Sequence, residues 1–202
     1  VSLHGKGGTH RSSFDELGLD RFLAEAVEHG AAPLAIAAVD GGDTYWHERD
    51  DGSDSGAMVV QELLPILARR GLDVERFGLF GWSMGGYGAL HLAAQERGPR
   101  PRLVATLSAA LWPAAGDTAP GAFDGPDDFA CADVFRARAR LADVPLRMDC
   151  GRDDPFADAN RAFRDGLLRE PEGGFQPGAH TVGYWRRMVP DHLAFAAEHL
   201  AG

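Results

Sequence analysis

The stretch that decides the fold reads Phe77-Gly78-Leu79-Phe80-Gly81-Trp82-Ser83-Met84-Gly85-Gly86-Tyr87-Gly88-Ala89-Leu90. Its first residues form a short apolar run typical of a buried strand, and the small residues after the serine favour a helix. Between them lies a G-x-S-x-G pattern centred on Ser83. A strand that turns sharply into a helix strains the residue at the apex, and side chains two residues to either side would collide there. The stretch therefore predicts a strand–turn–helix unit that presents Ser83 as a nucleophile.

Short apolar runs alternate with helical patterns along the whole chain. This alternation predicts an α/β protein with a mainly parallel sheet and helices on both faces. Right-handed crossovers would bring every strand-to-helix loop to one edge of the sheet, where ligands bind. A last helix is expected over residues 184–200, interrupted near Pro190. The sheet is predicted to have about six strands: residues 1–4, 34–39, 77–80, 103–107, 144–148 and a strand near 175.

Length and charge exclude several classes of protein. No linker divides residues 1–202, so we expect a single domain with a loop–helix insertion at about residues 112–142. The formal net charge of −10 disfavours binding to nucleic acid or anionic lipid, and no apolar run could span a membrane. No signal peptide is visible, which predicts a soluble protein, cytoplasmic, or exported if upstream residues are missing. Composition leaves the oligomeric state open, and only two cysteines, Cys131 and Cys150, are present.

A nucleophilic serine needs a base and an orienting acid, which in such a unit follow it in the order acid, then histidine. The strand at 144–148 runs into a glycine turn, after which Asp153 and Asp154 emerge where the acid is expected. Asp149 is close but still within the strand. Turn capping is a common role for such aspartates, so the residues alone leave the choice between Asp153 and Asp154 open.

Eight histidines compete for the role of base. Five of them precede the acid, which breaks the chain order. His192 and His199 lie on the last predicted helix, where packing or surface exposure is the usual role. His180 lies in a glycine-rich loop just before that helix and is therefore the candidate base.

The loop His4-Gly5-Lys6-Gly7-Gly8 follows the first predicted strand. We expect the backbone N–H groups of Lys6 and Met84 to stabilise a developing oxyanion, together with the positive end of the helix after Ser83. The loop lacks the third glycine of a dinucleotide fingerprint, and no phosphate-binding loop or spaced metal cluster occurs. We therefore expect neither a metal nor a cofactor.

Four aromatic residues are candidates to line an acyl or aryl pocket. Tyr45 and Trp46 lie in the loop after the second predicted strand, Trp82 adjoins the nucleophile, and Trp112 opens the insertion. Packing of the loops is an equally ordinary role for each of them.

These motifs resemble the α/β-hydrolase fold, and more narrowly the esterase family of esterase D (S-formylglutathione hydrolase), feruloyl-esterase-type enzymes and the antigen 85 mycolyltransferases. In that family the acid lies three residues past the turn glycine, which implies Asp154. Family members usually carry further strands before the first glycine loop, so the resemblance implies a sheet lacking the usual first strands. The resemblance spans nearly the whole chain and is carried by residues 4–8, 39–42, 81–90, 149–151, 154–156, 178–180 and 184–186.

The resemblance implies a serine esterase that uses Ser83, Asp154 and His180 on a carboxylic ester or thioester. Small soluble short-chain or aryl esters are the expected substrates, because the segment at 112–142 lacks the broad apolar face of a lipase lid. Acyl transfer to an alcohol, as in the mycolyltransferases, and a non-catalytic binding module on the same scaffold are the alternatives. The binding module is disfavoured, since all three members of the triad are present.

Overall fold

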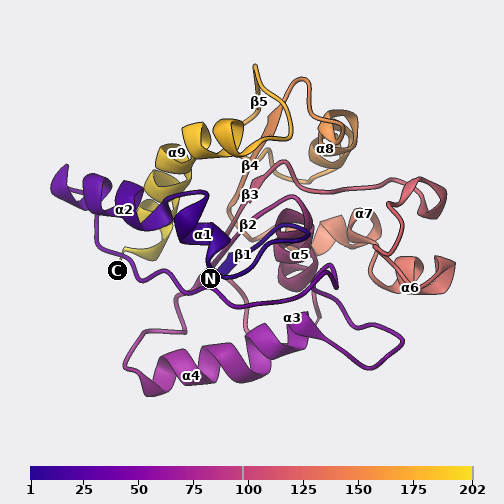
Figure 1. The fold of residues 1–202 in the computed structure, drawn as a ribbon, viewed down its shortest axis with the longest axis horizontal. Helices are drawn as coiled ribbons and strands as arrows, with labels where there is room; N and C mark the ends of the chain where they lie inside the picture. Colours follow the sequence, from indigo (N-terminus) through magenta and orange to yellow (C-terminus); the bar gives the residue numbers. More distant parts are fainter. Residues whose placement is uncertain (97, 202) are drawn as a thin grey trace.

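The computed structural model describes residues 1–96 and 98–201. Within them a sheet of five parallel strands has the order β1-β2-β3-β4-β5 (Figure 1). The longest pairing joins β2 and β3 over five positions, from Gly78 opposite Leu103 to Trp82 opposite Leu107. The prediction of a parallel α/β fold is confirmed. The strands are β1 (Ser2–Leu3), β2 (Gly78–Trp82), β3 (Leu103–Leu107), β4 (Leu146–Gly151) and β5 (Phe175–Gln176).

Helical segments connect the strands. The predicted insertion between β3 and β4 contains four short elements, and none of the helices among the described residues is long and apolar enough to cross a membrane. In chain order the segments are α1 (Ser12–Asp15), α2 (Leu19–Glu28), α3 (Ser55–Met58), the π-helix η1 (Val59–Leu63), α4 (Leu64–Arg69), α5 (Met84–Ala93), the 3-10 helix η2 (Ala115–Asp117), α6 (Pro126–Cys131), α7 (Val134–Ala137), the 3-10 helix η3 (Arg138–Leu141), α8 (Ala157–Asp165) and α9 (Val182–Leu200).

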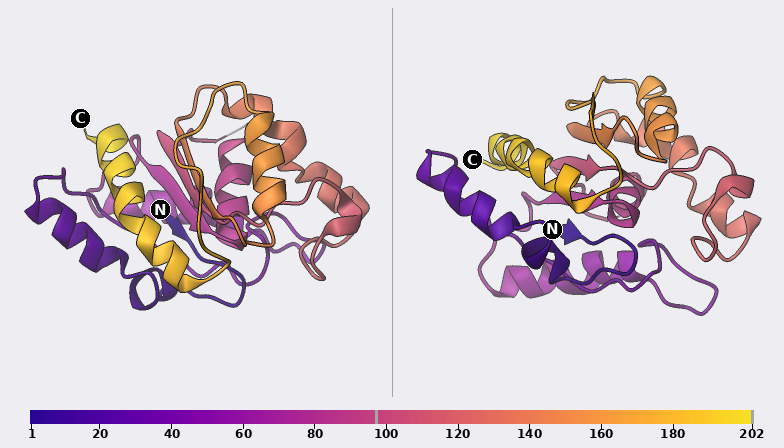
Figure 2. Two further views of the ribbon diagram at one scale, coloured as in Figure 1. Left: turned by 90° about the horizontal axis from the view of Figure 1, so that it is seen from above. Right: turned by 45° about the horizontal axis from the view of Figure 1, so that its top comes forward.

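Helices cover both faces of the sheet (Figures 1 and 2). On one face α2 lies beside α9, and Trp82 and Leu107 of the strands pack against Trp185 of α9. On the other face α5 and α8 cover the sheet, where Leu79 and Met148 belong to a larger apolar core. Burial of apolar side chains on both faces is what holds the parallel strands in register.

The prediction of a buried strand at residues 34–39 is wrong. This extended segment forms one isolated parallel bridge, Ser2 to Ala38, and the Ser2 N–H donates to the Ala37 carbonyl at 2.7 Å. The segment lies outside β1, and none of its residues is fully buried. Its apolar run resembles a strand in composition, but in the described structure no further strand pairs with its outer side.

The last helix is not interrupted near Pro190, contrary to the prediction. α9 runs from Val182 to Leu200 with the proline inside it. Pro190 is exposed, whereas Val189 and Leu193 are buried against the sheet. A proline removes one intrahelical hydrogen bond. Here the packing of the opposite face holds the helix together across that gap.

Candidate active site

Ser83 lies at the turn between β2 and α5 with a φ of 53° and a ψ of −120°. Few residues other than glycine adopt this conformation. A Cβ on Gly81 would overlap the backbone of Gly85, and a Cβ on Gly85 would overlap the carbonyl of Leu3. The Ser83 N–H donates to the Leu107 carbonyl at 2.9 Å, which ties the turn to the neighbouring strand. The two glycines thus permit the sharp turn that the sequence predicts.

The structure brings together the serine, the acid and the histidine that chain order and the resemblance point to. The Ser83 hydroxyl donates to His180 Nε2 at 2.9 Å, and His180 Nδ1–H donates to Asp154 Oδ2 at 2.9 Å. The three side chains follow β2, β4 and β5, so the sheet edge assembles them from distant parts of the chain. Asp153 is exposed, and its N–H donates to the Gly178 carbonyl instead.

The Asp154 carboxylate is buried and hydrogen-bonded on both oxygens. Besides the contact with His180, its Oδ1 accepts the N–H of Phe156 at 2.9 Å. Burial alone would raise the pKa of Asp154, but hydrogen bonds from His180, Ser108 and the Phe156 N–H outweigh it and hold that pKa below its ordinary value. The carboxylate is therefore ionised at neutral pH and can stabilise a positive charge on the imidazole.

Two residues with no predicted role support this arrangement. Ser108 directly follows β3, is fully buried and has a φ of 49°. Its Oγ accepts the Trp185 indole N–H at 3.0 Å. The Trp185 ring in turn meets the His180 ring edge-on, with centroids 4.9 Å apart. The one available sequence signal was that Ser108 is a polar residue immediately after a strand at the predicted edge.

The first glycine loop lies against the serine turn. A Cβ on Gly5 would come within 3.0 Å of Trp82 Nε1 and 3.4 Å of Ser83 Cβ. Among the described residues no hydrogen-bond acceptor faces the backbone N–H of Lys6 or of Met84. Both N–H groups therefore remain without a partner in the part of the chain that the structure describes.

A buried histidine fixes the shape of this loop. Gly41 N–H donates to His4 Nε2 at 3.0 Å, so the proton lies on Nδ1, which donates to the Gly5 carbonyl at 2.8 Å. The exposed Lys6 ammonium donates to the Pro120 carbonyl at 3.2 Å. The His4 ring therefore ties the loop to Gly41, and the Lys6 side chain ties it to the segment between β3 and α6.

The four aromatic candidates for substrate contact are all buried. Tyr45, Trp46 and Trp82 are at most 3% exposed, and Trp112 is 8% exposed. Tyr45, Trp46 and Trp112 pack in the larger apolar core, and Trp82 packs against α9 on the other face of the sheet. Phe156 is half-buried, and its ring contacts both Trp112, with centroids 5.5 Å apart, and His180, with centroids 5.3 Å apart. Its exposed part is the aromatic surface beside the histidine.

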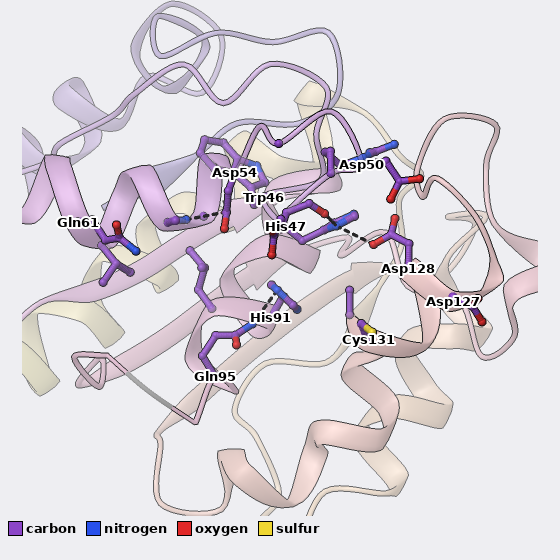
Figure 3. A pocket seen from close by; sticks show the side chains of 18 residues that line it. Trp46, His47, Asp50, Asp54, Gln61, His91, Gln95, Asp127, Asp128 and Cys131 are labelled. Atoms are coloured by element: carbon purple, nitrogen blue, oxygen red, sulfur yellow. Dashed lines mark hydrogen bonds and ion pairs between the residues drawn. The ribbon is translucent and has the colours of Figure 1, made fainter.

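A hollow of about 700 Å³ opens over α5, between residues 46–61 and α6 (Figure 3). Its lining includes His47, His91, Asp128 and Cys131 but none of the three residues of the candidate triad. Burial, together with the neighbouring His47, lowers the pKa of His91 to about 4. In residues 1–96 and 98–201 no three histidine, cysteine or acidic side chains converge as a metal site. The hollow is thus separate from the candidate catalytic centre.

The parallel sheet, the strained Ser83 turn and the serine–acid–histidine order define an α/β-hydrolase. The family model described as "Putative esterase" matches residues 3–195, so the chain belongs to this esterase family. As a member of this family the protein is a carboxylic ester hydrolase, and the resemblance drawn from the sequence is confirmed.

Solved structures support the same fold. A ferulic acid esterase is 20% identical with a TM-score of 0.80, covering 98% of this chain and 83% of its own. The S-formylglutathione hydrolase of Agrobacterium tumefaciens is 19% identical with a TM-score of 0.74, covering 99% and 83%. The fluorophosphonate-binding serine hydrolase F of Staphylococcus aureus is 19% identical with a TM-score of 0.79, covering 97% and 82%. No curated protein sequence matches the chain significantly.

Proposed function

We propose that the protein hydrolyses carboxylic esters and thioesters through a triad of Ser83, His180 and Asp154. The observation that carries this proposal is the unbroken chain of two 2.9 Å hydrogen bonds that links the three side chains. The strained turn that presents Ser83 and the ionised state of Asp154 support the same roles.

The reaction follows from this geometry. Ser83 Oγ attacks the ester carbonyl while His180 Nε2 takes its proton, and the resulting imidazolium is stabilised by Asp154. The N–H groups of Lys6 and Met84 donate to the oxyanion of the tetrahedral intermediate. Collapse of this intermediate breaks the bond to the leaving alcohol, which takes the proton from Nε2. A water molecule then attacks the acyl-enzyme by the same steps and frees Ser83.

The aromatic surface beside His180 favours short-chain or aryl esters. Phe156, backed by Trp112, offers a flat apolar face next to the reacting atoms. We expect activity to fall as the acyl chain lengthens beyond the short range, without a rise when the substrate passes its solubility limit. A series of p-nitrophenyl esters of graded length measures this directly, and a maximum at long chains would contradict it.

Replacement of the nucleophile tests the proposal. Ser83→Ala should lower kcat on p-nitrophenyl acetate by about 10⁶-fold, since only binding and oxyanion stabilisation remain. The matched control is Ser53→Ala, a change at an exposed serine outside the site, which should keep full activity. A Ser83→Ala protein with wild-type turnover would end the proposal. Product analysis with an added alcohol acceptor then separates hydrolysis from acyl transfer.

A further inference from the structure

Asp149, on β4, is a buried carboxylate outside the triad, 1% exposed. It accepts hydrogen bonds at four positions, which is the full acceptor capacity of an ionised carboxylate. Burial alone would raise the pKa of Asp149, but hydrogen bonds from His192 and Gln176 and the charge of Arg147 keep it below its ordinary value. Its donors are Gly174 N–H at 3.1 Å and Gln176 Nε2 at 2.7 Å on Oδ1, and Arg147 Nε at 2.9 Å and His192 Nε2 at 2.9 Å on Oδ2.

These donors lie on both sides of the loop that carries His180. Gln176 ends β5, immediately before the loop at 177–181, and His192 lies on α9, which follows the loop. The carbonyl oxygen of the Gln176 side chain also accepts the hydroxyl of Tyr184, in the first turn of α9, at 2.7 Å. One buried carboxylate thus joins the start of the loop to the helix at its end.

The loop between these anchors has little freedom. Asp153 N–H donates to the Gly178 carbonyl at 2.9 Å, and Thr181 N–H donates to the Ala179 carbonyl at 2.8 Å. Gly178 packs so closely on Tyr184 that a Cβ there would overlap the ring. With both ends fixed, the five residues at 177–181 leave His180 a narrow range of positions.

We propose that Asp149 is the positioning residue of His180: through Gln176 on one side and His192 on the other, it holds the His180 loop in register with Ser83. This inference rests on the proposed catalytic role of His180. Among the described residues Asp149 forms no hydrogen bond with the His180 ring, so it acts through the backbone that carries the ring.

A positioning role predicts a change in turnover more than in binding. Displacement of a catalytic group by about 1 Å can cost about 100-fold in rate. Asp149→Asn should therefore lower kcat on p-nitrophenyl acetate by about 10- to 100-fold while KM stays within about threefold. The acid limb of the kcat/KM–pH profile should move to lower pH, because a displaced imidazolium loses part of its contact with Asp154.

Asp191→Asn is the matched control. Asp191 shares Arg147 with Asp149, at 3.1 Å from Nη2, but it is exposed, and within residues 1–96 and 98–201 it forms no hydrogen bond or ion pair with the His180 loop. This variant should keep wild-type kcat, KM and pH profile. A folded Asp149→Asn protein with wild-type kcat and pH profile would overturn the inference. So would an equal loss in Asp191→Asn, because it would place the effect in the Arg147 ion pairs.

Gln176→Met decides the question if Asp149→Asn does not fold. It removes the amide that donates to Asp149 and accepts from Tyr184, and it keeps a side chain of similar length. We expect a loss of kcat of about three- to tenfold with KM retained, and the same direction of shift in the acid limb. Wild-type kcat and an unshifted acid limb would overturn the inference. Wild-type activity in Ser83→Ala would instead contradict the proposed triad. Failure of the proposed function can therefore be distinguished from failure of the inference about Asp149.

Discussion

Two of the histidine–aspartate pairs in the described residues have a fully buried carboxylate and the same nitrogen–oxygen distance. His180 Nδ1 lies 2.9 Å from Asp154, and His192 Nε2 lies 2.9 Å from Asp149. The His180 side chain is 25% exposed and its second nitrogen meets Ser83, whereas that of His192 is 2% exposed. Among the described residues no hydrogen-bond partner faces His192 Nδ1.

The difference teaches that a histidine–carboxylate contact does not by itself make a general base. Burial lowers the pKa of His192, even though the hydrogen bond from its ring to Asp149 opposes this, so the ring is neutral at pH 7. Its second nitrogen is buried and has no hydrogen-bond partner in the described structure. The second nitrogen of His180, by contrast, contacts the Ser83 hydroxyl. In the proposed mechanism the His180–Asp154 pair moves a proton, whereas the His192–Asp149 pair joins β4 to α9.

Removal of each histidine should therefore affect different properties. His180→Ala should lower kcat by about 10⁶-fold with little loss of stability. His192→Ala should lower the free energy of unfolding by about 3 kcal/mol, because a buried carboxylate loses a partner, while the folded fraction keeps kcat within about tenfold. Ester assays and urea titrations on both variants measure this. A dead but stable His192→Ala protein would reverse the assignment.

The neighbouring aspartates Asp153 and Asp154 should also differ in their effect on turnover. Asp154→Asn should lower kcat by about 10⁴-fold, since the imidazolium loses its counter-charge and its fixed tautomer. Asp153→Asn should change kcat less than about threefold, because Asp153 is exposed and its side chain does not contact His180. Steady-state kinetics on the two neighbouring variants provide the test. A larger loss in Asp153→Asn would move the acid by one residue.

The backbone N–H of Lys6 is expected to matter for catalysis, whereas the Lys6 side chain is not. Lys6→Pro removes the N–H proposed to face the oxyanion and should lower kcat by about 100-fold. Lys6→Ala keeps that N–H and loses only the contact with Pro120, so kcat should stay within about tenfold. A large loss in Lys6→Ala would assign the ammonium group a role in binding substrate.

The smallest predicted effect is the pH dependence of stability that the two buried histidines, His91 and His192, cause. The pKa values of His192 and His91 are lowered in the folded protein, that of His91 to about 4. As pH falls below about 6.5, these two histidines become protonated in the unfolded chain but stay neutral in the folded protein. The free energy of unfolding therefore declines from about pH 6.5 toward pH 4. Each ring contributes up to about 1.4 kcal/mol per pH unit. The melting temperature should fall as pH is lowered from about 6.5 to 4, and the fall should be shallower in His91→Gln. A flat profile would contradict this account.

The serine turn could be predicted from the sequence because its sterics are local. Gly81 and Gly85 are needed within two residues of Ser83, whatever the rest of the fold does. Chain order then selected His180 from the loop before the last helix. The choice of Asp154 over Asp153 needed the turn register of the family, because both carboxylates emerge from the same turn.

Other features depend on partners far apart in the chain. Asp149 and His192 are 43 residues apart, and Ser108 and Trp185 are 77 residues apart. No local sequence pattern therefore predicts either contact. The segment at 34–39 had the composition of a strand, but it forms only one isolated bridge, from Ala38 to Ser2. The sequence placed Trp46 in a loop at the catalytic edge, but it did not indicate that the side chain is buried in the core.

The most direct test of the central claim is to label the protein with a fluorophosphonate probe and locate the modified residue by mass spectrometry. A single labelled serine, Ser83, is expected. Labelling should be lost in His180→Ala, which removes the base, and retained in folded His192→Ala, which removes only the buried pair. Labelling of a different serine, or equal labelling of Ser83 with and without His180, would contradict the proposed triad.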